Sequence, residues 1–180
     1  MSAHLLVTLL LAFPPSTAAV PLDVQLPAFL KALSFERNLP LADGNLRIAV
    51  VFDPADFDSL SAKDQLIAIH RELTRLRVKG QTVVLVPIPY ESETALLSSG
   101  ARVILVASLP LHAVESLARQ SAVSDLLTFS TEAGDVERGL AVGMEMVGGR
   151  PRFIVNRKAA AEAGASFESG FLDLCRIVER

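Results

Sequence analysis

Side chains with hydroxyl, phenol or carboxylate groups stand at or just after the ends of four stretches of the sequence that are typical of buried strands. They are Asp53, Tyr90, Ser108, Ser130 and Thr131. The carboxyl ends of parallel strands share one edge of a sheet, and open α/β sheets bind their ligands at that edge. We therefore expect these five side chains to line a crevice that could hold a small molecule.

None of these groups has the neighbours in sequence that catalysis requires. No G-x-S-x-G motif surrounds Ser108, Ser130 or Ser169, and no general base is evident for any of the three. No glycine-rich phosphate loop follows the first strand, where the sequence reads FDPADFD instead. We expect no catalytic residue and no cofactor. A secreted hydrolase acting through Ser108, Ser130 and Asp53 is the weakest of three functional hypotheses.

An acidic group made of Asp53, Asp56 and Asp58 follows the first strand. A calcium site would need more oxygen ligands and the glycine of a D-x-D-x-D-G loop, and that glycine is missing. A phospho-accepting aspartate would need an Asp and a Lys at the ends of later strands, but those strands end near Ser108 and Ser130. We interpret the three carboxylates as turn and helix-cap residues, and we expect no metal site.

The composition narrows the classes of partner. The chain has 180 residues, enough for one domain, and a net charge of −3. The slight excess of acidic over basic residues gives no sign of the concentrated basic face that nucleic-acid binding requires. Cys175 is the only cysteine, so neither an intramolecular disulfide nor a Cys-based metal site can form. We expect Cys175 to act as a small buried hydrophobic residue.

The N-terminal segment has the features of a Sec-type signal peptide. Residues 5–13 read LLVTLLLAF, and Thr17 and Ala19 suit the pockets of signal peptidase. We predict a signal peptide over residues 1–19 and a single domain over residues 20–180, located in the periplasm. The segment MSAH lacks the usual basic residue, so a buried N-terminal helix is the alternative. No other apolar run is long enough to span a membrane.

The remaining patterns alternate between strands and helices. The first helix is expected over residues 26–35, with Pro27 in its first turn, and the second begins with a capping box at Ser61 and Asp64 and ends at Gly80. Strands are expected at 46–52, 82–88, 102–108 and 125–130, and further helices at 93–98 and 110–122. This order indicates a mostly parallel sheet with right-handed crossovers.

The spacing of apolar residues changes in the C-terminal part of the sequence. Two alternating apolar runs, 140–147 and 152–156, flank a turn at 148–151, which predicts an antiparallel hairpin. Asn156 is placed to cap a following helix. One face of a final helix is expected to carry Phe171, Leu174, Cys175 and Val178. We predict a three-layer, Rossmann-like α/β fold, like one half of a periplasmic binding protein, with a mostly parallel sheet and a C-terminal antiparallel hairpin and helix.

Several pieces of this C-terminal part form a more specific pattern. A strand at 127–130 is followed by Gly134 and Asp135, then by the hairpin, the segment FIVN at 153–156, an Ala-rich helix and a Ser- and Leu-rich closing segment. With these pieces the chain resembles the YfiR-like family of exported bacterial proteins. About the last third of the chain matches closely, and the rest agrees mainly in the order of its elements.

The resemblance implies a periplasmic regulatory protein that is not an enzyme and that forms homodimers. It implies a partner too: the periplasmic part of an inner-membrane signalling protein, a diguanylate cyclase or a sensor histidine kinase, which this protein would bind and restrain. The family's regulators carry cysteine pairs, and the single Cys175 cannot reproduce disulfide-based control.

Two functional hypotheses remain besides the hydrolase. A regulator should expose an apolar patch for its partner, and we expect that patch near Phe29 and Phe35 on the first helix. A small-molecule binding protein of transport or sensory type should instead have a pocket at the strand ends.

Overall fold

The computed structural model describes residues 19–39, 44–73, 76–91 and 93–179. Its described strands form one eight-stranded sheet in the order β2-β3-β1-β4-β5-β6-β7-β8. Their bounds are β1 (Asn45–Phe52), β2 (Arg77–Val78), β3 (Gln81–Pro89), β4 (Val103–Val106), β5 (Leu127–Ser130), β6 (Val142–Val147), β7 (Arg150–Asn156) and β8 (Arg176–Val178). Only the pairs β2–β3 and β6–β7 are antiparallel, so the sheet is mostly parallel as predicted.

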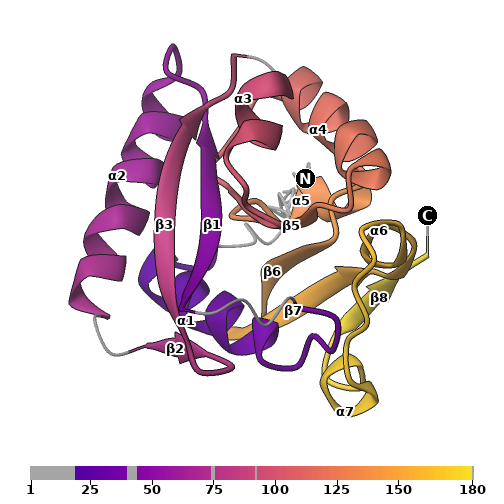
Figure 1. Ribbon diagram of the computed structural model, residues 1–180. Coiled ribbons are helices and arrows are strands. Elements are labelled where there is room, and N and C mark those ends of the chain that lie inside the picture. Colours follow the sequence, from indigo (N-terminus) through magenta and orange to yellow (C-terminus); the bar gives the residue numbers. More distant parts are fainter. Residues whose placement is uncertain (1–18, 40–43, 74–75, 92, 180) are drawn as a thin grey trace, which may run out of the picture.

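Helices cover both faces of the sheet, which gives the expected three layers (Figure 1). Their bounds are α1 (Leu22–Leu33), α2 (Phe57–Glu72), α3 (Glu93–Ser98), α4 (Leu111–Val123), α5 (Gly134–Glu137), α6 (Arg157–Glu162) and α7 (Ser169–Leu172). In β1, Ile48 and Val50 pack on the side of α1 and α2, whereas Ala49 and Val51 pack on the side of α3 and α4. Because both faces of this strand are buried, its sequence is apolar without alternation.

The order of strands around β1 determines where a ligand can bind. The chain passes from β1 to β3 on one side of β1 and then to β4 on its other side. In open α/β sheets, such a reversal leaves a crevice outside the carboxyl ends of the strands. We call the edge at which β1, β3, β4 and β5 end the carboxyl edge.

The first two helices begin earlier than the sequence patterns predicted. α1 begins at Leu22 after Pro21, so Pro27 lies inside the helix rather than in its first turn. α2 begins at Phe57, and its cap is Asp56 rather than a box at Ser61 and Asp64. The predicted starts were wrong because they were placed at the first apolar stripe, whereas a cap forms wherever a side chain can accept a hydrogen bond from the first turn.

The prediction that α2 continues to Gly80 was also wrong. The helix ends at Glu72, and β2 and β3 form a hairpin through Lys79 and Gly80, both of which have positive φ angles of 48° and 82°. Two consecutive residues with positive φ form the tight turn that joins twisted antiparallel strands, and no α-helix can contain them.

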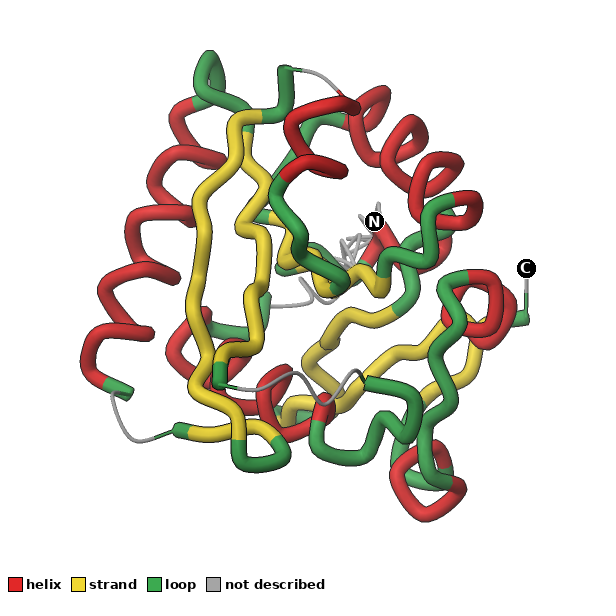
Figure 2. Tube along the Cα trace, in the orientation of Figure 1, coloured by secondary structure: helices red, strands yellow, loops and turns green. Residues whose placement is uncertain are grey.

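The C-terminal hairpin is confirmed, but the final helix is not (Figure 2). α7 has four residues, and the chain then adds β8 in parallel to the outer side of β7. The predicted helical stripe is divided: Leu174 is exposed, whereas Val178 is buried beside Val136 and Ile154. Pairing with the open side of β7 satisfies the backbone groups of β8, which outweighs its local helical pattern.

Residues 1–18 of the predicted signal peptide lie outside the described residues. Within the ranges given above, the structure contains no helix with the length and apolar character needed to cross a bilayer.

Candidate functional site

A cleft of about 420 Å³ opens at the carboxyl edge, where α1 and α2 begin and β4 and β5 end. Its volume lies within the range of about 300–1,000 Å³ that is usual for sites of small molecules. Its described lining residues are Ala19, Val20, Pro21, Leu22, Gln25, Asp58, Ser61, Ala62, Gln65, Ser108, Thr131 and Glu132. The cleft therefore lies at the reversal of strand order, on the side of the sheet covered by α1 and α2.

The wall of the cleft formed by the sheet depends on Ser108 and Thr131, which follow β4 and β5. The backbone N–H of Ser108 donates to Oγ1 of Thr131 at 3.2 Å. Ser108 has a φ of 49°, a conformation that is uncommon for a residue with a side chain. This hydrogen bond joins the ends of two neighbouring strands and gives the cleft a fixed wall.

Gln25 forms the part of the lining that comes from α1. It is only 1% exposed, and its Nε2 donates to the carbonyl oxygens of Val20 at 2.7 Å and Thr131 at 3.1 Å. Because both partners are acceptors, the amide nitrogen must face them. The Oε1 atom is buried and has no hydrogen-bond partner among the described residues.

The turn after β1 positions the first residues of α2. Oδ1 of Asp53 accepts from the backbone N–H of Ala55 at 2.8 Å, and Oδ1 of Asp56 accepts from that of Ser59 at 2.8 Å. These contacts confirm the turn and cap interpretation for both aspartates. Oγ of Ser59 also donates to the carbonyl oxygen of Ala107 at 2.5 Å, which ties α2 to the end of β4. Asp58 belongs to neither contact and instead lines the cleft.

The loop beneath Glu132 is held by a buried hydroxyl–carboxylate pair. Oγ of Ser130 donates to Oδ2 of Asp135 at 2.6 Å and accepts from the backbone N–H of Glu132 at 3.1 Å. Ser130 is fully buried and Asp135 is 4% exposed. Desolvation raises the pKa of Asp135, while the Ser130 hydroxyl and Arg138 act in the opposite direction. The pair fixes the loop that carries Thr131 and Glu132.

The electrostatic character of the cleft is acidic. Asp58 and Glu132 contribute carboxylates, and no Lys, Arg or His occurs among the described residues that line it. Desolvation raises the pKa of Glu132, and repulsion from Asp135 and Asp58 raises it further. The cleft thus offers acceptors and negative charge. Within the described ranges, no three side chains of His, Cys, Asp or Glu are grouped in a way that could hold a metal ion.

The comparison with protein families agrees with this architecture. The family model described as YfiR/HmsC-like matches residues 41–176. The chain belongs to the YfiR/HmsC-like family. This confirms the resemblance found in the C-terminal part, and the membership is consistent with a periplasmic regulator. No curated protein matches the chain in sequence.

Solved structures similar to this YfiR/HmsC-like chain show the same fold at low sequence identity. A conserved domain protein from Vibrio cholerae matches with a TM-score of 0.62 and 14% identity, over 88% of this chain and 60% of its own. An ABC domain in complex with L-Trp from Streptococcus pneumoniae matches with a TM-score of 0.59 and 13% identity, over 88% of this chain and 60% of its own. The substrate binding protein CD0873 from Clostridium difficile matches with a TM-score of 0.52 and 16% identity, over 74% of this chain and 54% of its own. This chain therefore spans about 60% of the length of the first two of these proteins.

The structure brings together two of the five predicted crevice residues, Ser108 and Thr131. The Asp53 side chain is used in its own turn, and Ser130 is fully buried against Asp135. Tyr90 packs with the apolar cluster on the opposite side of the sheet, under α3 and α4. All five residues stand at the carboxyl edge, but they lie on different sides of the sheet.

Sequence reasoning did not identify Gln25 and Glu132 as lining residues, and it considered Asp58 only as a metal ligand or cap. Two signals were available. Glu132 stands two residues after a strand that was predicted, and Gln25 is a polar residue beside Leu26 and Phe29 on the buried stripe of α1. A buried amide on an apolar stripe needs a partner from elsewhere in the fold.

The apolar patch expected at Phe29 and Phe35 is not on the surface. Phe29 is 2% exposed, and its ring packs edge-on against Phe129 with 5.1 Å between centroids. Phe35 is partly buried and stacks on Phe171 at 5.6 Å. Both rings join the core between α1 and the C-terminal segment, because the first helix turns its aromatic face toward the sheet. The expectation that Phe29 is exposed was therefore wrong.

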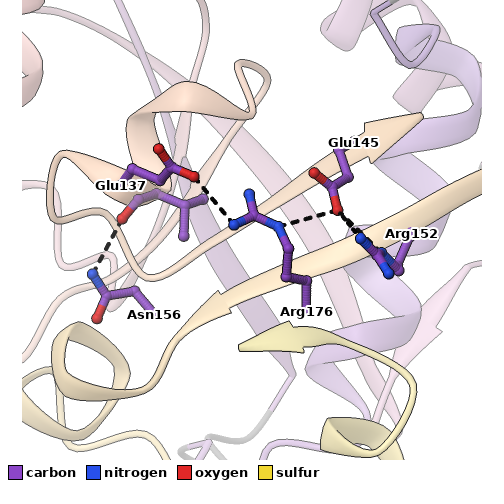
Figure 3. Close-up of polar contacts among 6 residues, drawn as sticks. Glu137, Glu145, Arg152, Asn156 and Arg176 are labelled. Carbon is purple, nitrogen blue, oxygen red and sulfur yellow. Dashed lines mark hydrogen bonds and ion pairs between the residues drawn. The ribbon is translucent and has the colours of Figure 1, made fainter. Parts of the chain in front are cut away.

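A second polar group lies on the C-terminal strands, and we call it the C-terminal network (Figure 3). Oε1 of Glu145 accepts from Nη2 of Arg152 at 2.6 Å and from Nε of Arg176 at 3.1 Å, and Arg176 reaches Glu137 at 3.1 Å. Nearby, Nδ2 of Asn156 donates to the carbonyl oxygen of Val136 at 3.1 Å, and its Oδ1 caps α6 through Ala159. The predicted cap is confirmed, and these contacts hold β6, β7, β8 and α5 together.

Proposed function

We propose that the protein is a periplasmic regulator that binds the periplasmic domain of an inner-membrane signalling protein, a diguanylate cyclase or a sensor histidine kinase, and restrains its activity. Membership of the YfiR/HmsC-like family supports a regulatory role. The role needs a surface for the partner and no catalytic group. Export through the predicted signal peptide and assembly into a homodimer belong to the same proposal.

The observation that carries the proposal is an exposed apolar rim at the carboxyl edge. Phe57, the first residue of α2, is 81% exposed, and Leu111, the first residue of α4, is 54% exposed. Val24, which is 40% exposed, lies between the lining residues Leu22 and Gln25. Large apolar side chains that gather at one edge and remain in solvent are typical of protein-binding surfaces.

The test uses the periplasmic domain of a membrane-bound diguanylate cyclase or sensor histidine kinase from the same organism. Phe57→Ala should weaken binding by roughly thirtyfold, or about 2 kcal/mol, because an aromatic anchor carries much of the energy of an interface. In cells, the same variant should raise the level of the signalling product. Val123→Ala is the matched control, since Val123 is also 81% exposed but lies at the other end of α4. Equal binding by both variants would contradict the proposed surface.

A second candidate function is binding of a small molecule, in transport or in sensing. The cleft at the carboxyl edge is the observation that favours it, since its volume of about 420 Å³ and its polar lining suit a small ligand. A ligand that binds the folded state should raise the melting temperature Tm.

A further inference from the structure

Cleavage of the predicted signal peptide changes the chemistry of Val20. Hydrolysis of the peptide bond between Ala19 and Val20 consumes one water, leaves a carboxylate on Ala19 and turns the backbone nitrogen of Val20 into an α-ammonium. Val20 is only 4% exposed, and its side chain belongs to the core cluster on the side of α1 and α2. Chain ends are poorly ordered unless they are tied down, and this one is held by the core.

Gln25 fixes the position of Val20 relative to the cleft. Its Nε2 donates to the carbonyl oxygens of Val20 at 2.7 Å and of Thr131 at 3.1 Å, so one amide holds the residue before α1 against the end of β5. Val20, Thr131 and Glu132 all line the cleft. Ala19, which is bonded to the nitrogen of Val20 until cleavage, is a lining residue too. The α-ammonium therefore forms at the cleft.

The cleft holds two carboxylates that the described lining leaves without a counter-charge. Asp58, in the first turn of α2, and Glu132 line it together with no Lys, Arg or His among the described residues. Repulsion from Asp58 contributes to the raised pKa of Glu132. Lys63 of α2 pairs with Asp64 instead, at 2.6 Å. The ammonium of Val20 is thus the positive charge that cleavage adds to an acidic site.

The start of α1 gives this ammonium a further need for carboxylates. Pro21 is the N-cap residue of α1 and makes no side-chain cap hydrogen bond. The N-terminal end of a helix carries a partial positive charge, so an ammonium just before it is unfavourable unless negative groups offset it. Asp23, in the first turn of α1, offsets part of this charge, and the carboxylates of the cleft offset more.

We infer that cleavage after Ala19 completes the fold, because the new α-ammonium of Val20 forms an ion pair with the carboxylates of Glu132 and Asp58 at the cleft. The exported protein then has a partly neutralised cleft and is more stable than the chain before cleavage. This inference rests on export through the signal peptide, which belongs to the proposed function, and it gives the cleavage a structural role. Docking of a protein partner through Phe57 does not depend on it.

The experiment compares two chains that differ in the position of their first charge. The mature chain comprises residues 20–180, and the extended chain comprises residues 16–180, whose four additional residues are uncharged. All described helices and strands lie within both chains. A protease that leaves no residue of its own releases each chain from an N-terminal carrier.

The mature chain should be the more stable of the two. Four added residues can displace the ammonium by about 13 Å, which exceeds the Debye length of about 8 Å at physiological ionic strength. The Tm of the mature chain should therefore be higher at pH 7 by about 2–4 °C. In an NMR titration, the pKa of Glu132 should also be lower in the mature chain than in the extended chain, because only the mature chain places a positive charge beside it.

Carboxylate variants locate the pairing. The difference in Tm between the two chains should shrink by at least half in Glu132→Gln and vanish in the double variant Glu132→Gln/Asp58→Asn. Asp64→Asn is the matched control, since the side chain of Asp64 is 72% exposed and does not line the cleft. This variant should leave the difference unchanged.

The dependence on pH separates an ion pair from a packing effect of the added residues. The ordinary pKa of an α-amino group is about 7.7–8.0, and pairing raises it in the folded mature chain. The Tm advantage should therefore be complete near pH 7 and be lost as the pH rises through the raised value. The charged groups around Val20 are Asp23 on α1, Asp58 on α2, Glu132 after β5 and Asp135 on α5, and carboxylates lose no charge at alkaline pH.

Three results would overturn the inference. Equal Tm values for the two chains at pH 7, or a difference that survives in the double variant, would show that Val20 forms no ion pair with these carboxylates, and either result would leave export untouched. N-terminal sequencing of the protein from the periplasm should give Val20 as the first residue, and another first residue would be the third such result. Absence of the protein from the periplasm would contradict export itself, and with it this part of the proposed function.

Discussion

The cleft at the carboxyl edge and the C-terminal network each contain at least two carboxylates. Those of the network are paired with arginines, whereas those of the cleft have no basic residue in the described lining. In the network, Glu145 accepts hydrogen bonds from both Arg152 and Arg176, and Glu137 also meets Arg176. In the cleft, Asp58 and Glu132 belong to a lining without a described basic residue, and repulsion from Asp58 helps to raise the pKa of Glu132. Paired charges of the first kind serve the fold, whereas unpaired charges cost stability until a counter-charge reaches them.

Asn156→Ala should have the largest effect, in the C-terminal half. Asn156 is fully buried, caps α6 through Ala159 and donates to the carbonyl oxygen of Val136. Removing its side chain should cost about 2–3 kcal/mol of unfolding free energy, because the variant loses both a helix cap and a buried hydrogen bond. Urea denaturation measures this loss. Asn156→Ser keeps a cap acceptor without adding a charge and should lose less stability; an equal loss in both would show that the cap contributes little.

Ser130→Ala should follow, with a loss of about 2 kcal/mol, because it removes a hydrogen bond to a buried carboxylate. The Asp135 carboxylate would then lose one of the contacts that lower its pKa, so that pKa should rise further above its ordinary value. An NMR titration of the Asp135 carboxyl carbon follows the change. A pKa that stays constant would mean that the 2.6 Å contact between Ser130 and Asp135 does not form in solution.

The sharpest test of the comparison replaces one glutamate by glutamine in each region. We expect these two variants to change the stability less than the variants above. Glu145→Gln should destabilise the protein by about 1 kcal/mol, and high salt should reduce this loss, as for other partly exposed ion pairs. Glu132→Gln should instead stabilise the extended chain at pH 7. Urea denaturation at several pH values and salt concentrations measures both.

The pH dependence of the Glu132→Gln effect follows from the raised pKa. In the folded protein Glu132 holds its proton to a higher pH than in the unfolded chain, whose pKa is near the ordinary value of 4.5. Its ionisation therefore lowers stability as the pH rises from about 4.5 through the raised value. The gain from Glu132→Gln should be present above this range and disappear below pH 4.5. Destabilisation of the extended chain by Glu132→Gln at neutral pH would show that the cleft carboxylate is paired after all.

The sequence alone was sufficient for the features that depend on local pattern. Residues buried on both sides of the sheet must be apolar throughout, so the parallel strands could be recognised from their composition. The glycine-containing turn at 148–151 predicted the β6–β7 hairpin, because few other residues adopt its positive φ angles. Asn156 was recognised as a cap because that role needs only a short polar side chain at a helix start.

Tertiary structure decided the features that need a partner distant in sequence. β8 is three residues long and forms only because β7 offers an open side, so its local pattern could not reveal it. Phe29 looked like a candidate for a docking surface until the fold placed Phe129 and Phe153 against it. The cleft depends on distant contacts in the same way. Gln25 meets Thr131 across 106 positions of the chain, and only the reversal of strand order beside β1 brings α1, α2 and the ends of β4 and β5 to one place.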